Sequence, residues 1–447
     1  MGITSKKEIE ESEPLIAVGI LQEQYAIRFS LFSGYKLNGN PLPSGDYLVE
    51  SSADGVSFQG KQYTEITFEP ENMHLDSFEL KEVIIGLNFH WERREDQRFQ
   101  GALKIIAEEK GITAINIVAL EDYLKSVISS EMSATSSEEL LKAHAVISRS
   151  WLLAQMEKNR FIDAGYQTSF VTPTEIIRWY DREEHARFDV CADDHCQRYQ
   201  GITRQTTSLV DKVIDATRGE VITYQHAICD TRFSKCCGGV MERFENVWEP
   251  CTHAYLQGKA DGKEGSDFPD LTQEEQADEW IRSSPPAYCN TQDATILRQV
   301  LNDYDRETAD FYRWKVVYTQ EELSTLIRER SGKDYGEIIS LEPLERGSSG
   351  RIIRLKIIGT ERVMTIGKEL EIRHTLSPSH LYSSAFVVDA EEEDSEGIPQ
   401  RFTLTGAGWG HGVGLCQIGA AMMAAEGQNH EEILLHYFPH TTIEKRY

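Results

Sequence analysis

The stretch "NIVALEDYLKSVISSEMSATSSEELLKAHAVISRSW", residues 116–151, contains two helical patterns joined by a short polar turn. Apolar side chains recur at helical spacing up to Glu131, so one face of the first predicted helix ends on a carboxylate. The apolar members of that face are Leu120, Leu124 and Val127. Ser136 and Glu139 then form a capping box that opens the second predicted helix. The stretch therefore predicts a helical core with Glu131 at its connection.

Strand-like runs lie on both sides of this helical pair. Short runs rich in β-branched and aromatic residues fill the first part of the chain, and strand patterns return after residue 350. We therefore predict an α+β protein, with a helical core flanked by β-rich regions from both halves of the chain. Its expected parts are a β-rich region at 1–115, the core at 116–260, a charged, helix-leaning inserted lobe at 261–345, and closing strands and helices at 346–447.

The charge of the chain argues against some partners. With 73 Asp and Glu against 46 Lys and Arg, its 447 residues carry a formal net charge of −27. Nucleic-acid binding depends largely on neutralising phosphates with cations, so no nucleic-acid partner is expected. No apolar run approaches the roughly 18 residues that indicate a membrane span. The start of the chain lacks the basic-then-apolar pattern of a signal peptide, so none is expected here.

Glu131 is the first candidate for chemistry. A carboxylate that ends an apolar helical face would be partly removed from water, which would raise its pKa and suit it to general acid catalysis. The competing interpretation is an ordinary exposed glutamate at the end of a helix. Spacing alone leaves both interpretations open.

The second candidate is a metal site in the segment 185–196. Its expected ligands are His185, Cys191, His195 and Cys196, which fall within 12 residues and offer the sulfur and nitrogen donors of tetrahedral zinc. Four protein ligands would leave no open position on the metal, which favours a structural role over that of a zinc hydrolase. The alternatives are a disulfide between the two cysteines, or free thiols beside surface histidines.

Adjacent cysteines precede a glycine pair in "CCGG", residues 236–239. A thiol in such a tight turn could be a nucleophile, but no histidine pairs with it in the sequence, so a catalytic cysteine is the weaker interpretation. The pairing of the cysteines outside the segment 185–196 stays open at this point. They are Cys229, Cys236, Cys237, Cys251, Cys289 and Cys416.

The segment "GAGWGHGVG", residues 406–414, has glycine at every second position. It lacks the lysine of a P-loop and the spacing of a dinucleotide-binding loop. Its glycines could let Trp409 and His411 lie along a groove, with backbone amides facing a ligand. The alternative is a tight turn in which a backbone carbonyl satisfies His411.

These segments together resemble the stage II sporulation protein D family of peptidoglycan lytic transglycosylases, which includes the amidase enhancers. The helical pair at 120–151 looks like the first signature of that family, with its Ser-Glu-Met turn. The segment 185–201 resembles a metal-bearing segment of some members, and "CCGGVMERFENVW" at 236–248 is similar to a glycine-pair turn of the family. The segment 406–439 looks like the closing signature nearly residue for residue.

The resemblance implies that Glu131 is a catalytic acid and base. Such enzymes cleave the bond between N-acetylmuramic acid and N-acetylglucosamine in glycan strands, the sporulation members acting on strands stripped of peptides. One carboxyl group suffices, because the C6 hydroxyl of the sugar is the nucleophile and closes a 1,6-anhydro ring; hydrolases use two carboxylates. The alternative is a non-catalytic glycan-binding module that stimulates a cell-wall amidase, which would need no titrating glutamate.

The resemblance also implies a structural zinc held by the four ligands at 185–196, and an envelope location with glycan strands and a cell-wall amidase as partners. Trp409 would stack on a sugar ring, and His411 would orient a substrate hydroxyl or Glu131. Arg149 would face a carboxylate of the substrate, with a buried structural arginine as the alternative. The other residues expected to line the glycan groove are Gly410, Gly412 and Gln417.

Overall fold

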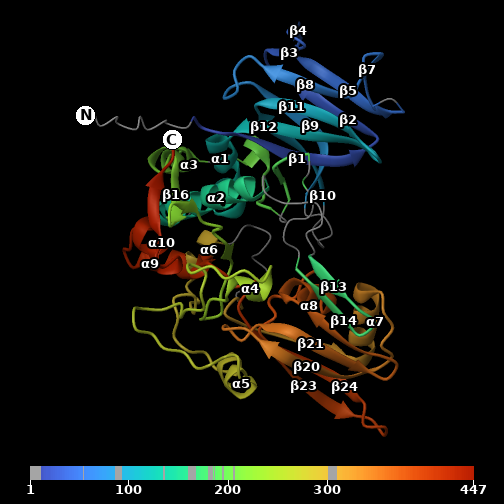
Figure 1. Ribbon diagram of the computed structural model, residues 1–447, viewed down its shortest axis with the longest axis vertical. Helices are drawn as coiled ribbons and strands as arrows, with labels where there is room; N and C mark the ends of the chain where they lie inside the picture. The colour runs from blue at the N-terminus through green and yellow to red at the C-terminus, as the bar shows by residue number, and fades with distance from the viewer. Residues whose placement is uncertain are drawn as a thin grey trace, which may run out of the picture.

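The computed structural model describes most of the chain, namely residues 12–53, 55–85, 93–133, 136–159, 168–179, 185, 187–193, 196–204, 207–300 and 310–447. In Figure 1 a β-rich region from the N-terminal part lies at the top, helices lie below it, and a second β-rich region lies at the bottom. The chain therefore alternates between sheet and helix along its length, as the sequence pattern indicates.

Two sheets make up the N-terminal β-rich region. The first contains seven strands, in the order β15 (Val190–Cys191), β1 (Leu15–Gln24), β12 (Gly111–Ala119), β11 (Ala102–Glu108), β8 (Glu65–Pro70), β3 (Tyr35–Leu37) and β4 (Asn40–Leu42). The second contains six, in the order β10 (Arg93–Gln100), β9 (Ser77–Ile85), β2 (Ala26–Leu31), β5 (Gly45–Ser52), β6 (Gly55–Phe58) and β7 (Lys61–Tyr63). Phe68 of the first sheet meets Phe29 and Phe58 of the second at ring-centroid distances of 4.8 and 5.2 Å, so the sheets pack face to face.

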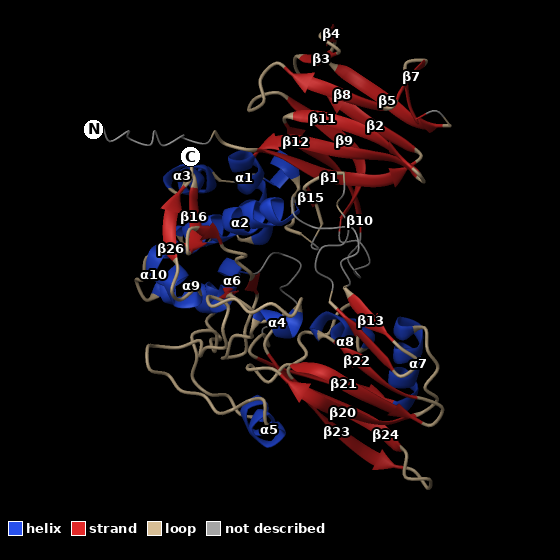
Figure 2. Cartoon of the chain, in the orientation of Figure 1, coloured by secondary structure: helices blue, strands red, loops and turns tan. Residues whose placement is uncertain are grey.

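The predicted helical pair forms α1 (Leu120–Glu131) and α2 (Glu138–Asn159). The apolar face of α1 is buried at Leu120, Leu124 and Val127, as its spacing predicts. The other helices around α2 are α3 (Ser208–Ala216), α6 (Ala294–Val300), α9 (Gln417–Ala425) and α10 (His430–Tyr437). Figure 2 shows these helices, drawn in blue, gathered beneath the N-terminal sheets.

Two small sheets join distant parts of the chain to this helical layer. One has the order β17 (Ala227–Ile228), β16 (Glu220–Tyr224) and β26 (Thr442–Lys445); the other pairs β18 (Phe233–Ser234) with β25 (Leu415–Cys416) in parallel. Because β25 directly precedes α9, this pairing brings the end of the glycine-rich segment beside residues 233–234. The closing residues thereby complete the core that begins at α1.

The second β-rich region contains a five-stranded sheet, in the order β13 (Ser169–Val171), β14 (Glu175–Arg178), β22 (Val363–Gly367), β21 (Ile352–Gly359) and β20 (Ile338–Arg346). A three-stranded sheet follows the order β19 (Arg313–Thr319), β24 (Pro399–Ala407) and β23 (Phe386–Glu393). The remaining helices are α4 (Phe244–Val247), α5 (Glu274–Arg282), α7 (Gln320–Ser331), α8 (Glu369–Thr375) and the short 3₁₀ helix at Gly201–Arg204. Residues 261–345, expected to be an inserted lobe, thus contribute β19 and most of β20 to sheets shared with residues 346–407.

These elements confirm the predicted α+β class, with several sheets around a helical core. In the part of the chain that the structure describes, every helix is too short or too polar to cross a membrane.

Candidate active site and metal centre

Glu131 is the last residue of α1, and its side chain is half-buried. The helix ends there because Met132 takes an extended conformation, with φ −118° and ψ 153°. The backbone N–H of Arg198 donates a hydrogen bond to Glu131 Oε1 at 3.1 Å. The carboxyl group is therefore held by a distant segment, which an ordinary exposed glutamate at a helix end would not be.

Other parts of the chain hold the turn that follows Glu131. The carbonyl oxygen of Gln299, in α6, accepts hydrogen bonds from the Ser133 N–H at 3.1 Å and from Ser136 Oγ at 2.6 Å. Gln417 Nε2, at the start of α9, lies 3.8 Å from Met132 Sδ. The turn is thus tied to elements on both sides of the core.

Three of the four expected metal ligands come together. The ligand atoms of His185, Cys191 and Cys196 all lie within 4.8 Å of one another, with 3.4 Å between His185 Nε2 and Cys196 Sγ. The fourth expected ligand, His195, lies outside the described residues. Both cysteines are free thiols, so the structure does not contain the alternative disulfide. The neighbouring Cys191 thiol and burial raise the pKa of Cys196 well above its ordinary value.

The metal-ligand cluster lies next in sequence to the segment that holds Glu131. Cys196 precedes Arg198 by two residues, and Gln197 between them is fixed to both helices of the core. The side chain of Gln197 accepts from Tyr123 Oη at 3.3 Å and donates to the Ser148 carbonyl at 3.3 Å. A metal bound at this cluster would therefore stabilise the backbone amide that contacts Glu131.

Neighbouring atoms of the protein lie against the glycines of the glycine-rich segment, on the side where a Cβ would project. Gly408, Gly410, Gly412 and Gly414 all have positive φ, between 74° and 90°. The atoms that an added Cβ would meet are Cys236 O at 2.8 Å for Gly408, Ser234 Cβ at 3.1 Å for Gly410, Arg351 Cζ at 2.5 Å for Gly412 and Arg232 O at 2.1 Å for Gly414. Backbone atoms, the Ser234 side chain and a guanidinium group of the protein itself therefore fill the space beside these glycines, so this side of the segment is not an open groove.

Arg351 fills the inside of this loop. Its side chain is 1% exposed and donates to the Gly410 carbonyl from Nε at 3.1 Å and from Nη2 at 2.9 Å. Its Nη1 donates to the Cys237 carbonyl at 3.0 Å. The guanidinium group therefore joins the glycine-rich segment to the "CCGG" turn, and Gly412 lies against it rather than in an open groove.

Trp409 is half-buried in an aromatic cluster. Its ring lies 4.8 Å from that of Phe311 and 4.6 Å from that of Tyr382, measured between centroids. Its backbone exchanges hydrogen bonds with Cys236, at 2.8 and 3.1 Å. Part of the indole thus supports the loop, and the exposed part is what a ligand could reach.

His411 packs edge-on against Trp248, with 4.8 Å between ring centroids. Burial, followed by the positive charges of Arg232, Arg351 and Arg373, holds the pKa of His411 well below its ordinary value. Its Nδ1 accepts the Val413 N–H at 3.0 Å, so the neutral ring carries its proton on Nε2. The ring also forms a hydrogen bond with the backbone of Phe233, which raises the pKa against the effect of burial and is the kind of contact that the tight-turn alternative predicts.

Two expected substrate-binding residues are buried instead. Gln417 is 2% exposed, and its Nε2 lies 3.0 Å from Nε2 of the buried His144. Arg149 is 0% exposed and forms a bidentate pair with Glu121, with Nε–Oε1 at 3.0 Å and Nη2–Oε2 at 2.7 Å. The burial and the pairing favour the structural alternative for Arg149, because a guanidinium group paired in the core does not face a substrate.

Comparison with known proteins supports the family resemblance. Residues 108–224, which include Glu131 and the metal-ligand cluster, match a family model described as stage II sporulation protein, and residues 242–414 match a domain of unknown function, DUF8618. Stage II sporulation protein D of Bacillus subtilis is 23% identical over 74% of this chain and 76% of its own length. Residues 108–224 thus match the stage II sporulation protein family, and relatives named stage II sporulation protein D and amidase enhancer are similar to most of the chain.

The other relatives differ in the share of their own length that the match covers. An uncharacterized protein of Brachyspira hyodysenteriae is 26% identical over 76% of this chain and 70% of its own length. The amidase enhancer of Bacillus subtilis is 23% identical over 72% of this chain but 40% of its own length. The similarity thus spans most of the present chain.

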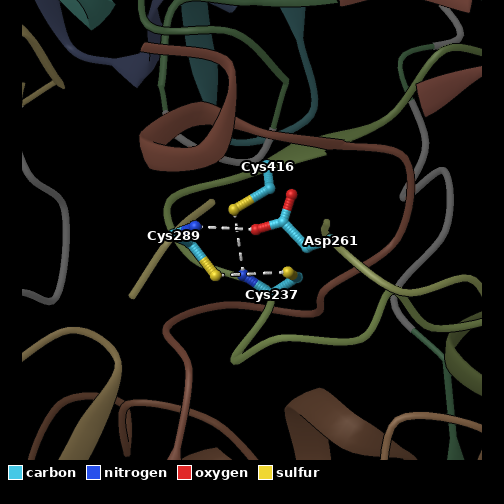
Figure 3. A group of neighbouring side chains, drawn as sticks. All are labelled: Cys237, Asp261, Cys289 and Cys416. Carbon is cyan, nitrogen blue, oxygen red and sulfur yellow. Dashed lines mark hydrogen bonds between the residues drawn. The ribbon is translucent and has the colours of Figure 1, made fainter. Parts of the chain in front are cut away.

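The "CCGG" turn holds no nucleophile. Cys236 and Cys237 are fully buried, and burial raises the pKa of both thiols well above the ordinary value, so neither is a reactive thiolate. Sequence reasoning missed what Cys237 does contact: Asp261, Cys289 and Cys416, which surround it in Figure 3. The available signal was the gathering of cysteines between residues 191 and 289, which does not identify partners.

Proposed function

We propose that this protein is a lytic transglycosylase of peptidoglycan glycan strands, with Glu131 as its acid and base. The observation that carries the proposal is the half-buried carboxyl group of Glu131, fixed at the end of α1 by the Arg198 N–H at 3.1 Å. It occupies the position of the Ser-Glu-Met glutamate, and the family match to residues 108–224 supports that placement. A relative named stage II sporulation protein D supports a role in the cell wall.

The proposed reaction uses one carboxyl group twice. Protonated Glu131 gives its proton to the glycosidic oxygen as the bond from that oxygen to C1 of N-acetylmuramic acid breaks. The C6 hydroxyl of the same sugar attacks C1, and the Glu131 carboxylate accepts its proton. The products are a free hydroxyl on the departing N-acetylglucosamine and a 1,6-anhydro ring, and no water is consumed. A hydrolase would need a second carboxyl group to activate water or attack C1.

The surroundings of Glu131 suit this role because they hold it in place. A catalytic side chain works best when neighbouring groups restrict its position. The Arg198 N–H restrains the carboxyl group, while Gln299 contacts Ser133 and Ser136 and Gln417 contacts Met132. We propose that zinc at His185, Cys191, Cys196 and the expected fourth ligand His195 fixes the Arg198 segment and takes no part in the chemistry.

Trp409 remains the proposed contact to the glycan, and His411 is proposed to hold the loop that presents it. The exposed part of the Trp409 indole could stack on a sugar ring, while the ring of His411 is already engaged by the Val413 N–H and the Phe233 backbone. Such a substrate also implies an extracytoplasmic location for this protein.

Product analysis tests the proposed reaction. Glycan strands stripped of peptides would be incubated with the protein, and the new chain ends identified by mass spectrometry before and after borohydride reduction. We expect 1,6-anhydro ends, which borohydride does not reduce. Reducing ends would instead mean hydrolysis and a second carboxyl group, which would contradict the proposal.

A second candidate function is stimulation of a cell-wall amidase by glycan binding, favoured by the relative named amidase enhancer. It would use the same binding surface but not the titration of Glu131. A Glu131→Gln variant that stimulates an added amidase as well as the wild type does, with neither protein producing anhydro ends, would establish this function in place of the first.

A further inference from the structure

Four ligand-type side chains from separate segments meet in the core beside the glycine-rich loop (Figure 3). They are Cys237, Asp261, Cys289 and Cys416, with exposed fractions of 2%, 0%, 1% and 0%. Their ligand atoms all lie within 4.8 Å of one another. This cluster is separate in sequence from the ligands at 185–196 and shares no residue with them.

The spacing fits one tetrahedral metal ion. With metal–sulfur bonds of about 2.3 Å, two ligands of a tetrahedral zinc lie about 3.8 Å apart. Cys237 Sγ and Cys289 Sγ lie 3.6 Å apart, which is close to that value and well beyond the roughly 2.05 Å of a disulfide. Cys237 and Cys289 are thus spaced like two ligands of one metal ion rather than like a disulfide, and all three cysteines of the cluster are free.

Hydrogen-bond donors contact the ligand atoms of the cluster, as they commonly do around metal sites. The Cys237 N–H donates to Cys416 Sγ at 3.2 Å, as backbone amides do for metal-bound sulfur. The Asp261 carboxylate accepts Tyr437 Oη at 2.8 Å on Oδ1 and the Cys289 N–H at 2.9 Å on Oδ2. These donors fix the orientation of the ligands without neutralising their charge.

A cation would balance the negative charge that the Asp261 carboxylate and the cysteine thiolates carry in this cluster. Among the described residues Asp261 takes part in no ion pair, although its carboxyl group is fully buried. A buried carboxylate without a positive partner is costly, and so are buried thiolates. Three sulfur donors and one oxygen select a soft or borderline divalent metal, and four protein ligands in tetrahedral spacing favour zinc.

We propose that Cys237, Asp261, Cys289 and Cys416 bind one structural zinc ion. The four ligands leave no open position, so the metal takes no substrate. Through Cys237 and Cys416, the metal joins the turn whose backbone pairs with Trp409 to β25, the strand after the glycine-rich segment. Through Asp261 and Cys289, it also joins the two ends of the segment between them. The site thereby holds the loop of Trp409 and His411 in place. This proposal does not depend on whether Glu131 is catalytic.

Metal analysis of the full chain tests the proposal. The Cys196→Ser variant removes a ligand of the other cluster, and adding Cys289→Ser shows whether the zinc that remains belongs to the new site. We expect one zinc per chain in Cys196→Ser and none in the Cys196→Ser, Cys289→Ser double variant. The matched control is Cys229→Ser in the Cys196→Ser background, because Cys229 is equally buried but lies outside the cluster; it should keep the zinc.

Zinc-edge X-ray absorption on Cys196→Ser keeps the test valid even if the double variant does not fold. We expect three sulfur neighbours at about 2.3 Å and one oxygen at about 2.0–2.2 Å. A Cys196→Ser protein purified without metal, or a zinc ion with nitrogen and oxygen neighbours alone, would overturn the proposal. A Cys237–Cys289 disulfide in the protein purified under reducing conditions would overturn it equally.

Discussion

Arg149→Met is expected to destabilise this protein without weakening its binding to glycan. Arg149 and Glu121 are 0% and 3% exposed, and two hydrogen bonds of 3.0 and 2.7 Å join them. Among the described residues, removing Arg149 leaves the buried Glu121 carboxylate with the Gly219 N–H and Tyr447 Oη as its remaining donors. Breaking such a buried pair costs about 3–5 kcal/mol, so the free energy of unfolding should fall by about that amount.

Urea unfolding of the full chain measures this loss. The matched control is Arg354→Met, because Arg354 pairs with Glu175 at the surface and is 41% exposed; exposed pairs contribute about 0–1 kcal/mol. Glycan binding is then measured at a urea concentration below the unfolding midpoint of the variant. There the affinity of the variant for glycan should equal that of the wild type. An Arg149→Met protein as stable as the wild type but unable to bind glycan would refute the structural assignment and restore the substrate-binding one.

Three further outcomes are expected. Trp409→Ala should weaken glycan binding, measured by sedimentation. Because the ring also packs on Phe311 and Tyr382, its loss should lower the free energy of unfolding by about 2 kcal/mol, less than the roughly 3–5 kcal/mol for a fully buried tryptophan. Unchanged affinity would assign the ring to packing alone. Chelation should lower the melting temperature by several degrees in a Cys289→Ser background, where only the cluster at 185–196 remains, and an unaltered melting curve would argue against that site. Burial lowers the pKa of His144 from 6.5 to about 3, so between those pH values only the unfolded chain binds this proton. The free energy of unfolding should therefore be retained above about pH 6.5 and fall as the pH drops toward 3. This pH dependence should weaken in His144→Gln, whereas an identical slope of the free energy of unfolding against pH would refute the effect.

Local patterns in the sequence were enough to predict the first helix and its end. The apolar spacing that leads to Glu131 specifies one buried face, and the structure ends α1 at that residue. The gathering of His185, Cys191 and Cys196 was predictable for the same reason, because these residues lie close in sequence. Features that depend on neighbours along the chain were therefore accessible from the sequence.

Features that depend on distant partners were not accessible. Cys237 meets Cys289 across 52 residues and Cys416 across 179, so no spacing rule connects them. The glycine-rich segment showed that the backbone needs space, but it could not show that Arg351 fills that space at Gly412. The sequence does not identify the partner of Arg149, because Glu121 lies in the first turn of α1, where an acidic side chain is favourable in any helix.

The most direct test of the account compares Glu131→Gln with the wild type on glycan strands stripped of peptides. Glutamine keeps an oxygen for the Arg198 N–H but cannot transfer a proton, and Glu138→Gln at the start of α2 is the matched control. We expect Glu131→Gln to form 1,6-anhydro ends at least about 100-fold more slowly, as loss of a general acid and base implies, with the control unaffected. Equal rates of anhydro product from Glu131→Gln and the wild type would contradict the assignment of Glu131.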